Sequence, residues 1–492
     1  MAKKIAILGA GLGGLSASLF LSQYDYQIEI FEKNSNIGGK LGYYENSGYK
    51  FDTGPSVLTM PFVIEKLFNS INENLLDYLE LIKLDPLNRN FFINSNYIDT
   101  YSDIEKMQLE LSKFSQKDAN NYLKFYNYIK KIYEKAADIF LNYPIQDLNY
   151  LFKNKIIPNF LNLIYLDVFK NMAERNQTFF EDYRINQIFN RYATYNGSNP
   201  FQTPATMNII SYVEIGLGAY YIKGGIYNLV KTFEKIIKKR NIKINYNSEI
   251  QEILIKNNKA IGIKVNNEII YYDSIISNID VIETFNHLIK NYAEEKIKLN
   301  KLEPSLSGFV ILAGIKKLNN NLLHHNVFFS QNYKEEFKQI FKGELPNDPT
   351  IYVAITSKND LVHSPKGCEN WFILVNAPYL NYSLVWDNEK NKYKEKIIDK
   401  FSQFGFDISN SIELEKVITP QDLYNFYRSN KGSIYGISSN NRMTAFKRPS
   451  NRYKKIKNLY FAGGSSHPGG GIPLVILSGI HAATLLNYYI NN

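Results

Sequence analysis

The sequence predicts an α/β protein in which a sheet of parallel strands is assembled from separated segments, together with a mixed part of sheet and helices. Three observations lead to this prediction. A strand breaks into a glycine turn and a helix at residues 3–21, a second strand, glycine loop and helix follow at 458–486, and strand pairs after a helix occupy 224–276 between them. Strand, glycine turn and helix in this order form the unit of nucleotide-binding folds. The nucleotide-binding part therefore draws on both ends of the chain.

The first glycine turn has the spacing of a dinucleotide site. Gly9 allows the tight turn, Gly11 lets backbone N–H groups approach a pyrophosphate, and Gly14 lets the helix pack close to the strand. A second strand, at residues 27–31, ends in Glu32, close to the ~20-residue spacing at which an acid binds the ribose. An acid there favours a free ribose hydroxyl over a 2′-phosphate. The alternative is a glycine-rich structural turn, and motif and acid together favour an adenine-dinucleotide site.

The residues that follow Glu32, up to Ser56, indicate which dinucleotide is bound. Residues 36–42 bring Gly39 and the cation Lys40 back towards the phosphates, and a hairpin follows at 43–51 before Gly54-Pro55-Ser56. These additional segments would enclose a bound cofactor. A nicotinamide cofactor is released at each turnover and does not need such enclosure, whereas a flavin that stays bound does need it. The arrangement resembles the FAD-binding N-terminus of the flavin amine oxidase superfamily. Lys40 stands where that superfamily often has arginine, which keeps the charge and loses the bidentate geometry.

Composition sets the class of protein and its expected surroundings. The 492 residues suffice for two or three domains, and 45% apolar with 21% charged residues is typical of a globular chain. The formal net charge is +10, but no basic cluster or RNA-binding signature accompanies it, so no nucleic-acid partner is expected. An anionic membrane surface is the expected partner, at about 1 kcal/mol for each well-placed Lys or Arg.

Cysteine usage and apolar runs narrow the class further. Cys368 is the one cysteine, which excludes disulfide frameworks, CxxC redox pairs and cysteine metal sites. Residues 1–4 lead directly into the first strand and leave no room for a signal peptide, so a cytoplasmic protein is expected. Residues 472–486 form the longest apolar run, short of the ~18 residues of a spanning helix. Any membrane association is therefore expected to be peripheral.

The middle of the chain supplies the substrate part. Residues 102–189 are mostly helical in pattern after an extended stretch at 84–100. Within them, 148–172 mixes aromatic and aliphatic side chains with lysines, which suits either a helix pair in a bilayer interface or a core helix. The expected FAD-binding segments are 1–83, 216–290 and 441–492. The expected substrate segments are 84–215, helical and membrane-facing, and 291–440, with sheet and helices.

The C-terminal glycine loop forms the second half of the predicted cofactor site. A strand ends at Gly463, and a loop dense in glycine can lie against a flat ring. Pro473 then opens a helix, a position that favours proline. The helix N-terminus is expected to face the flavin pyrimidine edge, where it stabilises the negative charge of a reduced flavin.

With these motifs in place, the whole chain resembles the bacterial phytoene desaturase family of carotenoid biosynthesis. The resembling segments follow the family order from end to end, and the HPGGGIP loop is the most specific of them; they are 1–56, 84–89, 195–200, 218–225, 277–278, 432–436 and 467–473. Three further stretches, at 325–330, 348–353 and 474–479, are similar to the branch acting on later carotenoids, such as the 1-hydroxycarotenoid 3,4-desaturases.

The resemblance implies FAD, a long lipophilic carotenoid held in a tunnel, and reoxidation by a quinone or oxygen at the membrane. Forming C=C from an unactivated C–C bond means moving a hydride to the flavin N5 and losing a proton from the adjacent carbon, so the flavin carries the hard step. The residues assigned to cofactor binding are Gly9, Gly11, Gly14, Glu32, Lys33, Gly39, Lys40, Gly54, Pro55, Ser56, Ile250, Gly463, Gly464, His467, Gly471 and Ile472.

No catalytic side chain and no metal site are assigned. His467 is the one histidine within a cofactor motif; it could accept a proton or orient the ring, and a hydrogen bond that braces the loop is the favoured role. Asp85 and Arg89 could form a catalytic or a structural pair, and the structural one is favoured. The other histidines have no metal-ligand spacing.

Three alternatives to desaturation stay open. Carotene isomerisation or terminal-methyl oxidation could run on the same scaffold, and spacing alone does not separate them. A non-catalytic lipid carrier, like the prenyl-binding GDP-dissociation inhibitors that resemble this fold, is opposed by the joint presence of Glu32 and the HPGGGIP loop. An amine oxidase is opposed by the lack of a flavin-linking cysteine near that loop and by Gly464 where an acid is usual.

Overall fold

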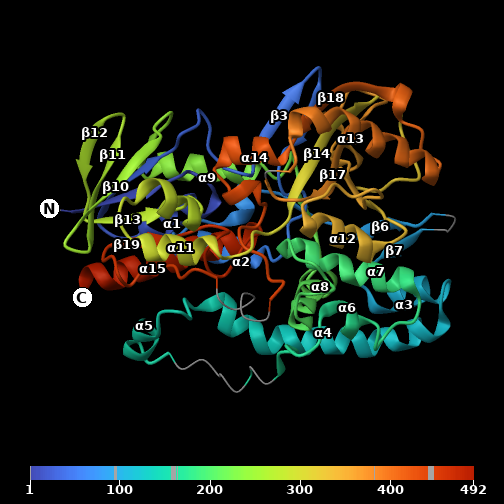
Figure 1. The fold of residues 1–492 in the computed structure, drawn as a ribbon, viewed down its shortest axis with the longest axis horizontal. Helices are drawn as coiled ribbons and strands as arrows, with labels where there is room; N and C mark the ends of the chain where they lie inside the picture. The colour runs from blue at the N-terminus through green and yellow to red at the C-terminus, as the bar shows by residue number, and fades with distance from the viewer. Residues whose placement is uncertain (1, 94–96, 157–161, 163–164, 382, 442–447) are drawn as a thin grey trace.

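Two sheets lie next to each other, with a block of helices along one side of the molecule (Figure 1). The computed structural model describes residues 2–93, 97–156, 162, 165–381, 383–441 and 448–492. Both chain termini lie at the end formed by the first sheet (Figure 1). Strands and helices contribute to both halves, so the predicted α/β class is confirmed.

The first sheet has five strands, all parallel, drawn from three separated segments. In spatial order they are β19 (Leu459–Phe461), β13 (Ser274–Ser277), β1 (Lys3–Leu8), β2 (Tyr26–Phe31) and β9 (Lys243–Asn245). Alternate residues of a strand face opposite sides of the sheet, so Ile5 and Ile7 pack into one core while Ala6 and Leu8 pack into another. Both faces are covered, as expected for a parallel sheet.

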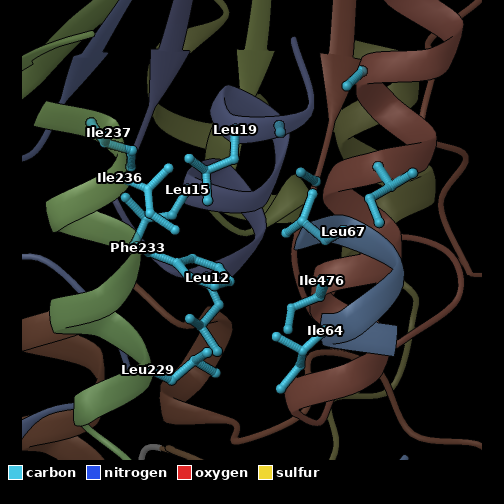
Figure 2. Packing of buried hydrophobic residues seen from close by; sticks show 14 of the residues in the cluster. Leu12, Leu15, Leu19, Ile64, Leu67, Leu229, Phe233, Ile236, Ile237 and Ile476 are labelled. Atoms are coloured by element: carbon cyan, nitrogen blue, oxygen red, sulfur yellow. The ribbon is translucent and has the colours of Figure 1, made fainter. Parts of the chain in front are cut away.

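Helices cover one face of this sheet and an antiparallel layer covers the other. The helices are α1 (Leu12–Leu21), α2 (Phe62–Ser70), α9 (Asn228–Lys239) and α15 (Ile472–Asn491). Figure 2 shows Leu15 of α1 directed towards Phe233 of α9, and Leu67 of α2 beside α15. The layer on the opposite face consists of β10 (Ile250–Lys256), β11 (Lys259–Val265) and β12 (Glu268–Tyr271).

Helices α1 and α15 join the two ends of the chain. They touch at Gly479, where a Cβ atom would lie 2.2 Å from the Gly13 carbonyl oxygen. Among the described residues, α15 is the one helix long and apolar enough to cross a membrane, whereas the sequence pattern predicted a run too short for that. Of its most apolar stretch, 61% is buried against the rest of the protein. Burial against α1 explains the apolar composition of α15 without a membrane.

The second sheet is mixed and has seven strands. In spatial order they are β18 (Ile412–Ile418), β14 (Ser307–Ile315), β17 (Glu369–Ala377), β16 (Ile351–Ala354), β15 (His325–Phe328), β6 (Asn88–Phe91) and β7 (Ile98–Thr100). Strands β6 and β15 pair in parallel and the others are antiparallel. The extended stretch predicted before the helical segment therefore belongs to this sheet. Helices α12 (Tyr333–Lys342) and α13 (Trp386–Lys400) contribute side chains to its hydrophobic cores.

The helical block lies along one side of the molecule (Figure 1). It comprises α3 (Ile104–Ser112), α4 (Gln116–Asn142), α5 (Leu148–Lys153), α6 (Met172–Asn176), α7 (Tyr183–Asn190), η3 (Arg191–Asn196), η4 (Ala205–Asn208) and α8 (Ile209–Ile215). Of the helix pair predicted over 148–172, α5 is described to Lys153, and residues 157–161 and 163–164 lie outside the described residues.

Short elements connect these layers. They are the hairpin β3 (Tyr43–Asn46) and β4 (Tyr49–Asp52), the pair β5 (Leu81–Lys83) and β8 (Tyr220–Ile222), η1 (Leu75–Asp77), α10 (Val281–Glu283), η5 (Thr284–Leu288), α11 (Ala293–Asn300), η6 (Thr356–Lys358), η7 (Leu361–His363), η8 (Phe401–Phe404), η9 (Ser409–Ser411), α14 (Pro420–Tyr427) and η10 (Asn430–Gly432).

Candidate active site

One cavity of about 710 Å³ connects the two halves of the molecule. The glycine loops of the parallel sheet line one part of it, and α4, α8 and the second sheet line the other. Its volume falls within the ~300–1,000 Å³ of small-molecule and cofactor sites. Of the residues assigned to cofactor binding, all but Gly14 and His467 line this cavity.

The N-terminus of α1 opens into the cavity without a capping group. Gly11 is the N-cap residue, no side chain hydrogen bonds to the first turn, and that turn contains no acid. Gly11 and Leu12 line the cavity, so the unpaired N–H groups of this helix end form a site for an anion such as a pyrophosphate. Gly14 does not line the cavity and packs against the preceding turn instead. A Cβ atom there would lie 2.3 Å from the Gly9 carbonyl oxygen.

Glu32 lies at the end of β2, beside the same turn. Its Oε2 accepts a hydrogen bond from the Ala10 N–H at 2.8 Å, and its Oε1 accepts one from the Asn34 N–H at 3.0 Å. A carboxylate has about four acceptor positions, so capacity remains for ribose hydroxyl groups. Lys33 and Ile250 line the cavity with it, Ile250 from the start of β10.

Lys40 points across the cavity to the C-terminal half of the chain. Its Nζ donates to the Ile434 carbonyl at 2.6 Å and to the Ser433 carbonyl at 3.0 Å. Burial lowers the pKa of Lys40 to about 8, against the opposite effect of the Asp280 carboxylate. The Ser56 hydroxyl lies 2.6 Å from the Tyr352 hydroxyl of β16, so both predicted polar groups contact the substrate half.

A second uncapped helix end faces the cavity. Gly463, Gly464, Gly471 and Ile472 line it, and α15 begins there with no capping side chain and with proline in its first turn. At Gly471 no atom lies within 4 Å of the position that a Cβ would take. This arrangement fits FAD. The helix end of α1 suits the phosphates, the acid beside it suits the ribose, and the glycine backbone at the start of α15 suits the flat ring.

His467 turns away from the cavity. Its Nε2 donates to the Tyr143 carbonyl at 3.1 Å, just beyond α4, and its ring stacks on His481 of α15 with centroids 5.7 Å apart. The ring therefore fastens the glycine loop to the helical block. The glycines of the loop line the cavity and His467 does not, because its ring is held by the Tyr143 carbonyl.

Acid should destabilise this contact. Burial lowers the pKa of His467 to about 4, below the usual 6.5. Between these two pH values the unfolded chain binds the proton more readily than the folded chain. The contribution of His467 to the free energy of unfolding is therefore fully present above pH 6.5 and is lost as the pH falls towards 4, by up to about 3 kcal/mol. Denaturant unfolding at pH 7 and pH 5 should show a smaller loss in His467→Gln than in the parent protein. An equal loss in both would contradict this contribution.

No sequence pattern indicated a role for Arg448, which connects the two halves of the cavity wall beside the glycine loop. Its Nη1 donates to the carbonyls of Gly464 at 2.7 Å and Tyr435 at 2.9 Å, and its Nη2 donates to Asn196 Oδ1 at 2.7 Å. Burial lowers its pKa to about 10. A lone arginine gives no spacing signal, so only the fold shows this role.

The part of the cavity lined by α4, α8 and the second sheet is mainly apolar. The lining side chains of this kind are Ala136, Phe140 and Leu141 of α4, Ile209, Ile210 and Val213 of α8, and Met207, Leu306, Val310, Val327, Phe372, Leu374 and Ile434. A few polar groups interrupt this wall, among them Arg191, Tyr195 and Tyr352. A wall of this composition suits a long hydrocarbon.

The predicted pairing of Asp85 with Arg89 is wrong. Arg89 makes a bidentate pair with Asp99, both distances being 2.8 Å, and Asp85 pairs with Lys106 at 2.7 Å. None of these four residues lines the cavity, so the structural interpretation of Arg89 stands with a different partner. Within the described part of the chain, no group of three or more His, Cys, Asp or Glu side chains could hold a metal ion.

Comparisons with known proteins agree with this architecture. Residues 7–74 match the NAD(P)-binding Rossmann-like domain family. A 1-hydroxycarotenoid 3,4-desaturase from Flavobacterium sp. is 36% identical, over 98% of this chain and 99% of that protein. A 4,4′-diapolycopene oxygenase from Methylomonas sp. is 34% identical, over 97% of this chain and 96% of that protein.

Two solved structures share the fold. An oxidoreductase from Methanosarcina mazei has a TM-score of 0.67 at 15% identity, covering 97% of this chain and 99% of that one. A putrescine oxidase variant redesigned in its cofactor binding has a TM-score of 0.65 at 10% identity, covering 99% of both chains.

Proposed function

The chain belongs to the carotenoid desaturase family, and from this membership we propose that it introduces C=C bonds into a long carotenoid polyene with FAD as its cofactor. It is an oxidoreductase of the FAD type. The observation that carries the proposal is that two uncapped helix ends and a largely apolar wall line the same cavity.

In this proposal each part of the cavity wall has one task. Bound there, FAD supplies the acceptor for the hydride that leaves one carbon of the polyene, while the adjacent carbon loses a proton and a C=C bond remains. The N–H groups of α1 hold the pyrophosphate, and Glu32 holds the ribose. The apolar side chains of α4 and α8 position the polyene and exclude water. A quinone or oxygen is the proposed electron acceptor.

Oxidation of a terminal methyl group is the second candidate. A relative named as an oxygenase aligns over nearly the same length as the one named as a desaturase, at 34% against 36% identity. Cavity residues alone do not separate the two reactions, because both need a polyene beside the cofactor.

Product analysis tests the proposal and separates the candidates. The FAD-loaded protein is incubated with phytoene, lycopene or a 1-hydroxycarotenoid in liposomes, and the products are analysed by mass spectrometry. Desaturation predicts the loss of two hydrogen atoms per bond formed. A gain of oxygen would favour terminal oxidation, an unchanged mass with altered geometry would favour isomerisation, and a protein purified without flavin would favour a lipid carrier.

We also propose that the exposed side chains of residues 152–155 and 169–170 dock on an anionic membrane. Phe152 and Phe169 are 74% and 79% exposed, Lys153 and Lys155 are exposed close to Phe152 in sequence, and Lys170 is exposed next to Phe169. Aromatic side chains with flanking lysines suit a bilayer interface, where burial of each aromatic ring contributes roughly 1.5–3 kcal/mol.

Replacing both aromatic residues, in Phe152→Ser/Phe169→Ser, should weaken binding to anionic liposomes by more than about tenfold. Sedimentation with the vesicles measures this, and Leu361→Ser serves as the control because Leu361 is 85% exposed outside this surface. Salt should release the parent protein in part, since the lysines contribute about 1 kcal/mol each. Binding that is insensitive to both changes would contradict the docking surface.

A further inference from the structure

Arg191 is a buried cation in the wall of the substrate cavity, and the proposed chemistry does not use it. It begins η3, is 6% exposed, and lines the cavity beside Thr194 and Tyr195. Its guanidinium lies over the rings of Tyr192 and Tyr195, at 5.0 and 5.4 Å from their centroids. Burying a charge in a largely apolar tunnel is costly unless it has partners.

Most donors of this guanidinium have no acceptor. Its Nη1 donates to the Tyr195 hydroxyl at 3.3 Å, but Nε and Nη2 have no hydrogen-bond partner within the described residues. Glu214 Oε1 is 3.6 Å from Nη2, beyond hydrogen-bond length. Two buried nitrogen atoms without an acceptor in one side chain are a rare arrangement that indicates a missing acceptor.

Glu214 is already satisfied by neutral donors. Its Oε1 accepts from Asn88 Nδ2 and from the Tyr192 hydroxyl, both at 3.0 Å, and its Oε2 accepts from the Tyr195 hydroxyl. The carboxylate therefore fixes Tyr195 and balances the charge of Arg191 without saturating its donors. The Arg191–Glu214 pair is neutral overall. An added anion would therefore be a buried charge without a compensating cation, which is costly.

We propose that Arg191, held next to Tyr195, binds a neutral oxygen, a hydroxyl or carbonyl, at or near one end of the polyene. This makes Arg191 a determinant of which carotenoids are accepted. The inference rests on the proposed function, and it names the substrate class as an oxygenated polyene in preference to a pure hydrocarbon. A site with an unpaired buried donor discriminates strongly against a ligand that lacks the matching acceptor.

Binding of matched polyenes tests the inference. The FAD-loaded protein in detergent is titrated with polyenes of equal length that end in a hydrocarbon, a hydroxyl, an aldehyde or a carboxylate, and Kd is measured from the polyene absorbance. The parent protein should prefer the hydroxyl or the aldehyde over the hydrocarbon by about tenfold or more. Arg191→Gln should bring this ratio close to one.

Two further variants keep the test decisive. Arg191→Lys retains the charge that faces Glu214 but loses the planar guanidinium, so it should fold even if Arg191→Gln does not. Its preference for oxygenated over hydrocarbon polyenes should also fall. Arg184→Gln makes the same change outside the cavity, on α7, and should leave the preference unchanged.

The inference is overturned if the parent protein binds hydrocarbon and oxygenated polyenes equally, if the preference persists without Arg191, or if the carboxylate binds most tightly. Flavin reduction, followed anaerobically in the same samples, tests the proposed function separately. Arg191-dependent binding with the flavin still oxidised would retain the oxygen site and reject desaturation. Flavin reduction without an Arg191-dependent preference would retain desaturation and reject the oxygen site.

Discussion

Gly11→Val should abolish the retention of FAD. Gly11 lines the cavity at the uncapped N-terminus of α1, so its branched side chain would occupy the space of the pyrophosphate. A Cβ atom there would also lie 2.8 Å from Asn278 Nδ2, which donates to the Gly9 carbonyl in the same turn. The ratio of flavin to protein after gel filtration should fall from near one to near zero.

A control separates cofactor loss from general destabilisation. Gly405 has a positive φ of 82°, and no atom lies within 4 Å of a Cβ placed there. Gly405→Ala therefore strains the backbone by about 1 kcal/mol without touching the cavity. This variant should keep its flavin although its melting temperature falls. A Gly11→Val protein with an unchanged flavin ratio would contradict the assignment of this turn.

Gly479→Ala should be the most destabilising small substitution in α15. Its Cβ would lie 2.2 Å from the Gly13 carbonyl oxygen and 3.0 Å from the Ala17 N, both in the backbone of α1. Backbone atoms cannot rotate away, so the helices must separate, at a cost of about 1–3 kcal/mol or more. Since both helices begin at the cofactor cavity, flavin retention should weaken together with stability.

Thr484→Ala is the matched control. It lies on the same helix, is half-buried, and should change the free energy of unfolding by less than about 0.5 kcal/mol. Denaturant unfolding and the flavin ratio are measured for both variants. Equal stability of Gly479→Ala and the parent protein would mean that the two helices do not pack as closely as described.

The cofactor half could be predicted from sequence because its determinants are local. Gly9, Gly11 and Glu32 lie within one continuous strand–turn–helix–strand unit, and the residues of each glycine loop need no distant partner to be recognised. The order of motifs along the chain then placed both loops in one site. The cavity brings these loops together.

The remaining parts depend on contacts between distant segments. Arg448 reaches Asn196 across 252 positions, and His467 reaches Tyr143 across 324, so neither orientation follows from a motif. The His467 ring accordingly lies outside the cavity although its loop lines it. Arg191 and Glu214 lack any spacing that marks a site, and only the packing of η3 on α8 places them together.

Anaerobic mixing of the flavin-loaded protein with a carotenoid in liposomes tests the central claim most directly. If the polyene and FAD meet in one cavity, the visible absorbance band of the bound flavin should bleach with phytoene, lycopene or a 1-hydroxycarotenoid, and return on addition of oxygen or a quinone. A flavin that stays oxidised while the carotenoid is bound would contradict hydride transfer in this cavity.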